Sequence, residues 1–136
     1  MAEIKIHAFW KCAALKIVRL PDGIPTANCL YQSGIEEVYI PDSVTTVSHF
    51  TECLSLRKVD IGTGIKTFNQ NSFNGDTVLA VFIMRAMAPP SYAGWTLPDT
   101  FTGTIYVPDE AVDAYKVADG WRKWASMIKP LSEYVE

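Results

Sequence analysis

The residue types that could carry catalysis or bind a metal are few in this 136-residue chain, and their spacing suits neither task. None of the three cysteines, Cys12, Cys29 and Cys53, lies in the Cys-x-x-Cys spacing typical of zinc and redox sites. The two histidines, His7 and His49, have no cysteine or carboxylate at ligand spacing. Buried free thiols explain the cysteines better, because a free cysteine behaves as a small apolar residue. We therefore expect no metal and no cofactor.

Two other motifs are similar to ligand-binding loops but fit simple turns better. Gly62-Thr63-Gly64 lacks the third glycine and the following helix of a dinucleotide-binding loop. The Pro-Asp pairs beginning at Pro21, Pro41, Pro98 and Pro108 lack the dense acidic spacing of calcium loops, and Pro-Asp commonly initiates a turn. Serine, histidine and aspartate are present, but residue order alone does not establish a catalytic triad. We expect no catalytic residue and no enzyme activity.

The sequence does contain a repeated pattern of apolar residues, Phe-x-x-Cys-x-x-Leu-x-x-Val-x-Ile. Its leucine position is filled by Leu15, Ile35, Leu56 and Leu79, with spacings of 20, 21 and 23 residues. Such spacings lie within the range of leucine-rich repeats. A unit this short cannot bury its own apolar face, so successive units must stack on one another. The pattern therefore predicts a solenoid with a continuous core.

The strands of this solenoid can be placed from the last two apolar positions of each unit. These positions are two residues apart, which is the period of a β-strand, so they share one face. We predict parallel strands at residues 16–20, 36–40, 57–61, 80–84 and 104–107. The inward residues are Val18/Leu20, Val38/Ile40, Val59/Ile61, Phe82/Met84 and Ile105/Val107. The outward residues are Ile17/Arg19, Glu37/Tyr39, Lys58/Asp60, Val81/Ile83 and Thr104/Tyr106.

The repeat resembles that of the BspA-type bacterial leucine-rich repeats, Ala-Phe-x-x-Cys-x-x-Leu-x-x-Val-x-Ile-Pro-x-x-Val. Matching residues are Ala8, Phe9, Cys12, Leu15, Val18, Leu20, Pro21 and Ile24, then Phe50, Cys53, Leu56, Val59, Ile61 and Ile65. The pattern departs at Cys29, Gln32 and Asp76. The resemblance covers almost the whole chain. Together with the periodicity it predicts an α/β solenoid, a leucine-rich-repeat-like parallel β-ladder of four to five rungs with a C-terminal helical cap. It also implies a surface or adhesive protein without catalytic residues.

We expect one domain over residues 1–136, with repeats at about 6–100 and a strand and cap at about 101–136. Asp109 is the expected N-cap of the first cap helix, with Val112, Tyr115 and Val117 on its buried side. A second helical segment follows at residues 121–128. The last coil of a solenoid exposes apolar surface, so the tryptophans of the cap, together with Trp95, are expected to close the core.

The net charge argues against a nucleic-acid partner, and the distribution of apolar residues argues against a membrane span. A net charge of −3 and a pI near 5.3 provide no basic surface for nucleic acid. No apolar run approaches the 18 residues of a membrane span.

The N-terminus lacks the features of a secretory signal. The location is the cell surface or outside the cell if a signal was removed, and the virion or cytoplasm if Met1 is the native start. Only residues 1–6 precede the first unit. Either this end docks on a partner or on another copy, or Ile4 and Ile6 suffice as a short edge strand.

The leading prediction is a non-catalytic protein-binding or adhesion module within a larger assembly, with a host protein or an assembly component as its partner. The alternative is a virion structural subunit, such as a phage decoration, fibre or receptor-binding protein. Arginine and aromatic residues are enriched at interface hot spots, although the same residues also suit an ordinary solvated sheet face. The candidate partner-binding residues are Arg19, Glu37, Tyr39, Lys58, Asp60, Val81, Ile83 and Tyr106. Among them, Val81 and Ile83 are expected to form an apolar patch at one end of the outward side.

Overall fold

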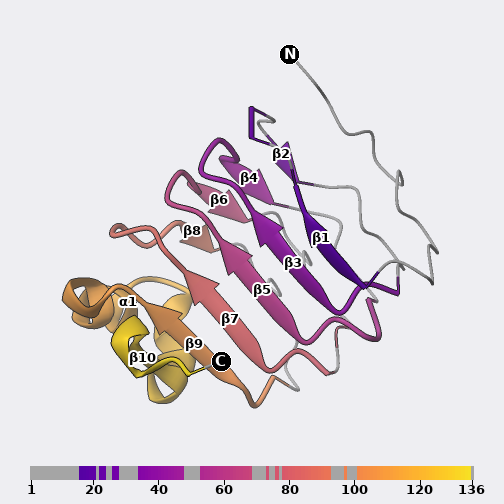
Figure 1. Ribbon diagram of the computed structural model, residues 1–136. Helices are drawn as coiled ribbons and strands as arrows, with labels where there is room; N and C mark the ends of the chain where they lie inside the picture. Colours follow the sequence, from indigo (N-terminus) through magenta and orange to yellow (C-terminus); the bar gives the residue numbers. More distant parts are fainter. Residues whose placement is uncertain are drawn as a thin grey trace.

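A computed structural model describes residues 16–20, 22–23, 26–27, 34–47, 53–68, 73, 76, 78–92, 97 and 101–135 of the chain. This part forms a solenoid with two β-sheets, and the strands within each sheet are parallel (Figure 1). The larger sheet has the strand order β1-β3-β5-β7-β9-β10, and the smaller has the order β2-β4-β6-β8. Strands of the two sheets alternate along the repeats, so each coil adds one strand to each sheet. The expected leucine-rich-repeat-like α/β solenoid is confirmed.

The strands are short. The larger sheet consists of β1 (Ile17–Arg19), β3 (Glu37–Ile40), β5 (Lys58–Ile61), β7 (Val81–Met84), β9 (Thr104–Val107) and β10 (Ile128–Pro130). The smaller sheet consists of β2 (Thr26–Ala27), β4 (Thr46–Val47), β6 (Thr67–Phe68) and β8 (Ser91–Tyr92). The C-terminal part adds the 3-10 helix η1 (Asp109–Ala111), the helix α1 (Val112–Val117) and the 3-10 helices η2 (Trp121–Met127) and η3 (Leu131–Glu133).

The strand register follows the apolar columns of the sequence. One column of paired residues runs Val18, Val38, Val59, Phe82 and Ile105. All five side chains are buried in the core between the two sheets. The leucine-position residues Ile35, Leu56 and Leu79 are buried as well. The predicted register of the five strands is therefore confirmed.

The turns that leave the larger sheet are in contact from coil to coil. The Asp42 carboxylate accepts a hydrogen bond from the backbone N–H of Thr63, one coil later, at 2.7 Å. The Ser43 hydroxyl accepts one from the N–H of Gly23, one coil earlier, at 2.9 Å. A Cβ at Gly64 would lie 1.9 Å from the carbonyl oxygen of Asp42. Gly62-Thr63-Gly64 is therefore a turn, as predicted, and Gly64 allows two backbones to approach closely.

Asp76, which breaks the cysteine column of the repeat, is buried and has a structural role. Its carboxylate accepts a hydrogen bond from the backbone N–H of Cys53 in the preceding coil, at 2.7 Å. The Cys53 side chain is itself buried, as expected for a small apolar residue. A buried backbone N–H needs an acceptor, and Asp76 supplies it.

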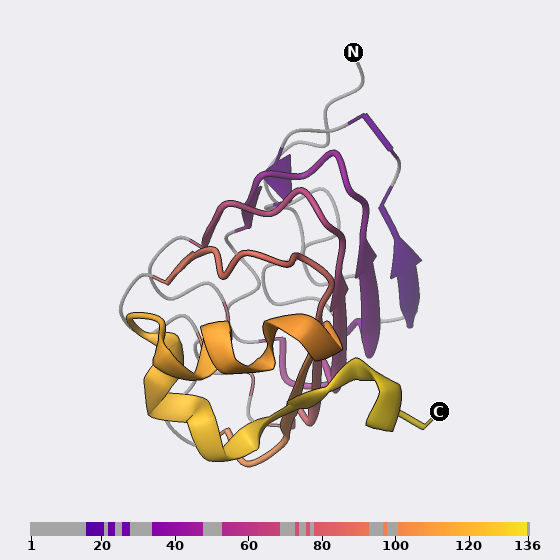
Figure 2. The same ribbon diagram turned by 90° about the vertical axis from the view of Figure 1, so that its left-hand side faces the viewer.

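The C-terminal cap covers the last coil as expected (Figure 2). Trp121 and Trp124 are buried, and the Trp121 ring lies edge-on to Phe68 with centroids 5.9 Å apart. The Trp121 indole donates to the carbonyl of Pro90 at 2.9 Å. The Tyr115 hydroxyl donates to the carbonyl of Ala86 at 2.8 Å, and burial raises the pKa of this hydroxyl. The polar atom of each ring is thus hydrogen-bonded inside the core.

Several details of the cap differ from the prediction. Asp109 is not a helix N-cap, because its carboxylate accepts from the backbone N–H of Ser132 at 3.0 Å; this bond lowers the pKa of Asp109. Val117 is 74% exposed instead of buried. Residues 121–127 form a 3-10 helix, and β10 then pairs in parallel with β9, a strand that the sequence did not predict. The smaller sheet was not predicted either.

Several predictions fall on residues outside the described part of the chain. They concern the N-terminal end, residues 1–6, and the side chains of His7, Cys12, Cys29, His49 and Trp95.

The close approach at Gly64 can be tested by substitution. Gly64→Ala should lower the free energy of unfolding by about 1–3 kcal/mol, because its Cβ would force the stacked turns apart. Thr63→Ala, at the exposed neighbouring position, keeps the backbone N–H and should have little effect. Urea denaturation of both variants measures the difference. Equal stability of the two variants would contradict the stacking of the turns.

The role of Asp76 gives a second test. Asp76→Ala removes the acceptor for the Cys53 N–H and should destabilise the fold by about 1–3 kcal/mol. Asp76→Asn retains a carbonyl oxygen at the same place, so it should recover most of that loss. Thermal unfolding followed by circular dichroism compares the pair. An alanine variant as stable as the parent chain would show that the bond is dispensable.

Candidate binding surface

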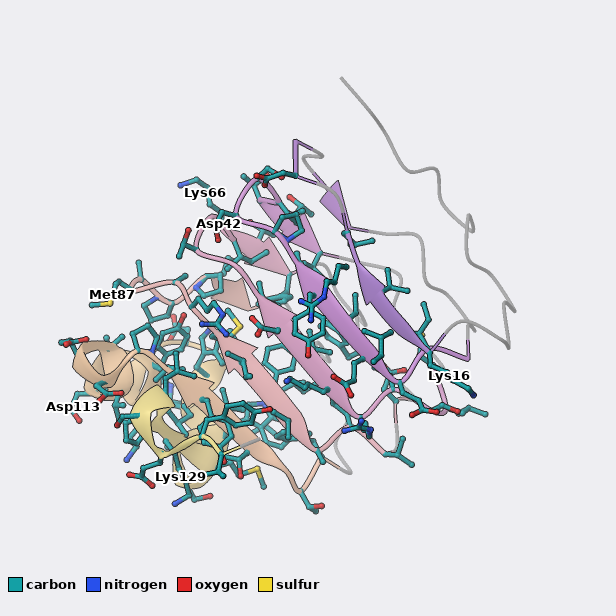
Figure 3. All side chains as sticks on the ribbon, in the orientation of Figure 1. Lys16, Asp42, Lys66, Met87, Asp113 and Lys129 are labelled. Atoms are coloured by element: carbon teal, nitrogen blue, oxygen red, sulfur yellow. The ribbon has the colours of Figure 1, made fainter. Side chains whose placement is uncertain are left out.

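The outward side of the larger sheet, called here the outer face, carries two columns of side chains. The first column is Arg19, Tyr39, Asp60, Ile83 and Tyr106. The second is Ile17, Glu37, Lys58, Val81 and Thr104. Figure 3 looks onto this face, with Lys16 at the end where the strands begin and Asp42 at the end where they stop. Adjacent strands are about 4.8 Å apart, so neighbours in a column can touch.

The part of the face on β1 and β3 is a group of stacked and hydrogen-bonded side chains with one exposed arginine. The guanidinium carbon of Arg19 lies 4.0 Å from the centroid of the Tyr39 ring, in a cation–π contact. The Tyr39 hydroxyl donates to the Glu37 carboxylate at 2.9 Å, and Glu37 also pairs with Arg57. Arg19 is exposed, whereas Tyr39 and Glu37 are partly buried. The guanidinium is therefore presented to solvent on an ordered support.

The middle of the face is held by a charged pair. Arg85, just after β7, donates to both carboxylate oxygens of Asp60, through Nε at 2.7 Å and through Nη2 at 2.8 Å. The hydrogen bond with Asp60 is the main cause of the raised pKa of Arg85. Asp60 is only 8% exposed, so its charge depends on this two-point contact. A shallow depression of about 330 Å³ lies here, lined by Arg19, Tyr39, Asp42, Asp60 and Arg85.

The part of the face nearest the C-terminus is covered. Tyr134, which follows η3, packs on Tyr106 in a T-shaped arrangement with ring centroids 5.0 Å apart. The Lys58 amine lies 5.1 Å from the ring centroids of both Tyr39 and Tyr134. Figure 2 shows the C-terminal end of the chain on the outward side of the larger sheet. With the rings of Tyr39 and Tyr134 close to its amine, Lys58 is only 5% exposed.

One expectation about this face is wrong. The parity of β7 correctly places Val81 and Ile83 on the outward side, but they do not form an exposed apolar patch. Ile83 has no exposed surface, and Val81 is partly buried. Strand parity determines the direction of a side chain and does not reveal what packs on top of it.

Charged side chains at the beginning of the strands form a further row. Lys16 and Arg57 flank Glu36, at 3.5 Å and 4.0 Å, and all three are solvent-accessible. Exposed pairs of this kind contribute little to stability. Glu37 and Lys58 are opposite each other in β3 and β5, as the predicted columns of outward residues require. The Glu37 carboxylate nevertheless contacts Tyr39 and Arg57.

Arg57, Arg85 and Tyr134 join the outer face although the sequence analysis did not select them. Arg57 lies immediately before β5, one residue before Lys58, and Arg85 lies immediately after β7, two residues after Ile83. This proximity to the columns is a signal that could have identified them. Tyr134 lies beyond the repeats and has no such signal. Its position depends on β10 and η3, which return the chain to the sheet.

Two further features of the described ranges are the grouping of possible metal-ligating side chains and the length and apolar character of the helices. No group of three or more histidine, cysteine, aspartate or glutamate side chains there could hold a metal ion. Likewise, none of the helices described has the length and apolar character required to cross a bilayer.

The charged pair on the outer face can be tested against a more exposed pair. Arg85→Ala leaves the nearly buried Asp60 carboxylate without its two-point donor and should destabilise the chain by about 1–2 kcal/mol. Arg122→Ala is the matched control, because its partner Asp119 is 94% exposed and the effect should be much smaller. Urea denaturation measures both variants. The account of the outer face would be contradicted if Arg122→Ala cost as much as Arg85→Ala.

Of the comparisons with known proteins, the one with protein families agrees with this architecture. No curated protein matches the chain. The family model described as the BspA type leucine rich repeat region (6 copies) matches residues 1–87. Proteins with these repeats are commonly protein-binding or adhesion modules and are typically not enzymes. The match covers more than half of the chain and includes β1 to β7, so the chain belongs to the BspA-type leucine-rich repeat family.

Proposed function

We propose that the chain is a non-catalytic protein-binding or adhesion module that acts within a larger assembly and uses its outer face as the contact surface. The observation that carries this proposal is the exposed Arg19 guanidinium stacked on Tyr39, whose hydroxyl is bonded to Glu37. Family membership supports the general role in protein binding.

The chemistry of this group suits a protein interface. Arginine and tyrosine are enriched among the residues that dominate binding energy. A side chain that is already ordered loses less conformational entropy when a partner binds. The cation–π contact and the hydrogen bond to Glu37 provide this order for Arg19 and Tyr39. The adjoining depression gives a partner side chain a place to enter.

The eight candidate residues have different roles in this proposal. Arg19, Glu37 and Tyr39 form the accessible part of the surface, on β1 and β3. Asp60 and Lys58 are nearly buried and support the surface from within, while Val81 is partly buried. Tyr106 packs beneath Tyr134, and Ile83 acts only as buried support. The partner is a protein of the host or of the assembly. No described feature favours the alternative role as a virion structural subunit.

Differential affinity capture tests the proposal. The immobilised chain, the variant Arg19→Glu and the control Lys116→Glu would be incubated with extracts of the source organism and of cells that it contacts. Lys116 is an exposed residue of α1, outside the outer face, so the control makes the same charge change elsewhere. We expect the parent chain and Lys116→Glu to retain the same protein. Arg19→Glu should bind it about 30-fold more weakly, as for a hot-spot residue.

Capture of the same proteins in equal amounts by all three chains would contradict the use of the outer face. A partner lost with Lys116→Glu and retained with Arg19→Glu would place the contact on the cap instead.

A further inference from the structure

We propose that residues 131–134, called here the C-terminal strap, are an internal ligand of the outer face. In this arrangement Tyr134 occupies a site for an aromatic side chain between Lys58 and Tyr106. A partner that carries an aromatic residue on an extended segment would take the same site. This inference rests on the proposed function only in assigning the partner to the outer face.

The site is defined by two contacts of different character. The edge-to-face contact with Tyr106, at 5.0 Å between centroids, fixes the orientation of the Tyr134 ring. The Lys58 amine, 5.1 Å from the Tyr134 centroid, adds a cation–π contact. Because Lys58 is only 5% exposed, water competes weakly for its charge and the aromatic contact is strengthened. An aliphatic side chain could not replace the ring in either contact.

The strap itself is weakly attached compared with the sheet beneath it. None of the residues of η3 is buried, and Tyr134 is only partly buried. The Ser132 N–H bonds to Asp109, whose side chain is exposed, and the Tyr134 N–H bonds within the strap to the carbonyl of Leu131. By contrast, the inward residues of β5, β7 and β9 are buried in the core. Segments with few buried contacts open with a small free-energy change while the rest of the fold persists.

These properties specify the partner segment. It must offer an aromatic face to the Lys58 amine and an edge or face to Tyr106, and it must be narrow enough to lie where the strap lies. The Lys58 amine lies between the rings of Tyr134 and Tyr39, and the exposed Arg19 guanidinium stacks on Tyr39. A partner can therefore contact Arg19 first and reach the Tyr134 site next to it. Displacement of Tyr134 then extends the contact toward the C-terminal end of the sheet.

Acylation of lysine amines, followed by mass spectrometry, tests the inference on the full chain without any partner. In the parent chain Lys58 should react slowly, whereas Lys116, an exposed residue of α1 outside the outer face, serves as an internal reference. Tyr134→Ala should raise the relative rate at Lys58 about 30-fold, the ratio that corresponds to losing a cation–π contact of a desolvated amine. Tyr134→Phe retains the ring and should react like the parent chain.

Addition in trans then separates an exchangeable ligand from a structural contact. A synthetic peptide with the sequence of residues 130–135, at millimolar concentration, should restore the protection of Lys58 in Tyr134→Ala. The same peptide with alanine in place of tyrosine should not. If Tyr134→Ala fails to fold, Asp109→Ala loosens the strap at Ser132 and should give an intermediate increase at Lys58, which the tyrosine peptide reverses.

An unchanged Lys58 rate in the variants would overturn the inference, as would equal protection by the two peptides or by neither. These outcomes are independent of the capture experiment, because no partner is present. Loss of the proposed function would leave the Lys58 rates as predicted, and failure of the strap would leave capture through Arg19 intact.

Discussion

The hydrogen-bond ladder of the larger parallel sheet sets the distance between successive coils, and the rest of the structure depends on this constraint. At about 4.8 Å per strand, each side chain meets its equivalents in the coils on either side. The core can then be built from columns of equivalent apolar residues, such as the column of valine, phenylalanine and isoleucine that begins at Val18. The same spacing brings backbones together at the turns. A Cβ at Gly103 would lie 2.1 Å from the carbonyl oxygen of Ala80, and Gly64 meets Asp42 in the same way.

The ladder also determines the chemistry of the outer face. Arg19 stacks on Tyr39 because β1 and β3 pair in a register that makes them neighbours. Lys58 lies close to Tyr39 from the next strand for the same reason. A one-residue shift of any strand would exchange its inward and outward residues and destroy both the core and this surface. Fold and candidate binding surface are therefore consequences of a single register.

The sequence alone was sufficient to predict the strands whose apolar residues recur at a fixed spacing. It was not sufficient to predict the elements that lack this pattern. The strands of the larger sheet, through β9, and their outward columns followed from the spacing of Leu56, Val59 and Ile61 and their equivalents. The smaller sheet escaped prediction because its two-residue strands are too short to show alternation. The packing of Tyr134 on Tyr106 escaped because it joins segments that belong to no repeat. Asp109 had the type and position of an N-cap, but the backbone of Ser132 offered its carboxylate a different donor.

The most direct test of the account is the set of nuclear Overhauser effects between side chains of the core column in an isotope-labelled sample. The account predicts a continuous series in which Val38 contacts Val18 and Val59, and Phe82 contacts Val59 and Ile105. Contacts in that order would establish the register on which both the core and the outer face depend. Contacts that skip a strand, or that join inward residues of one strand to outward residues of the next, would contradict it.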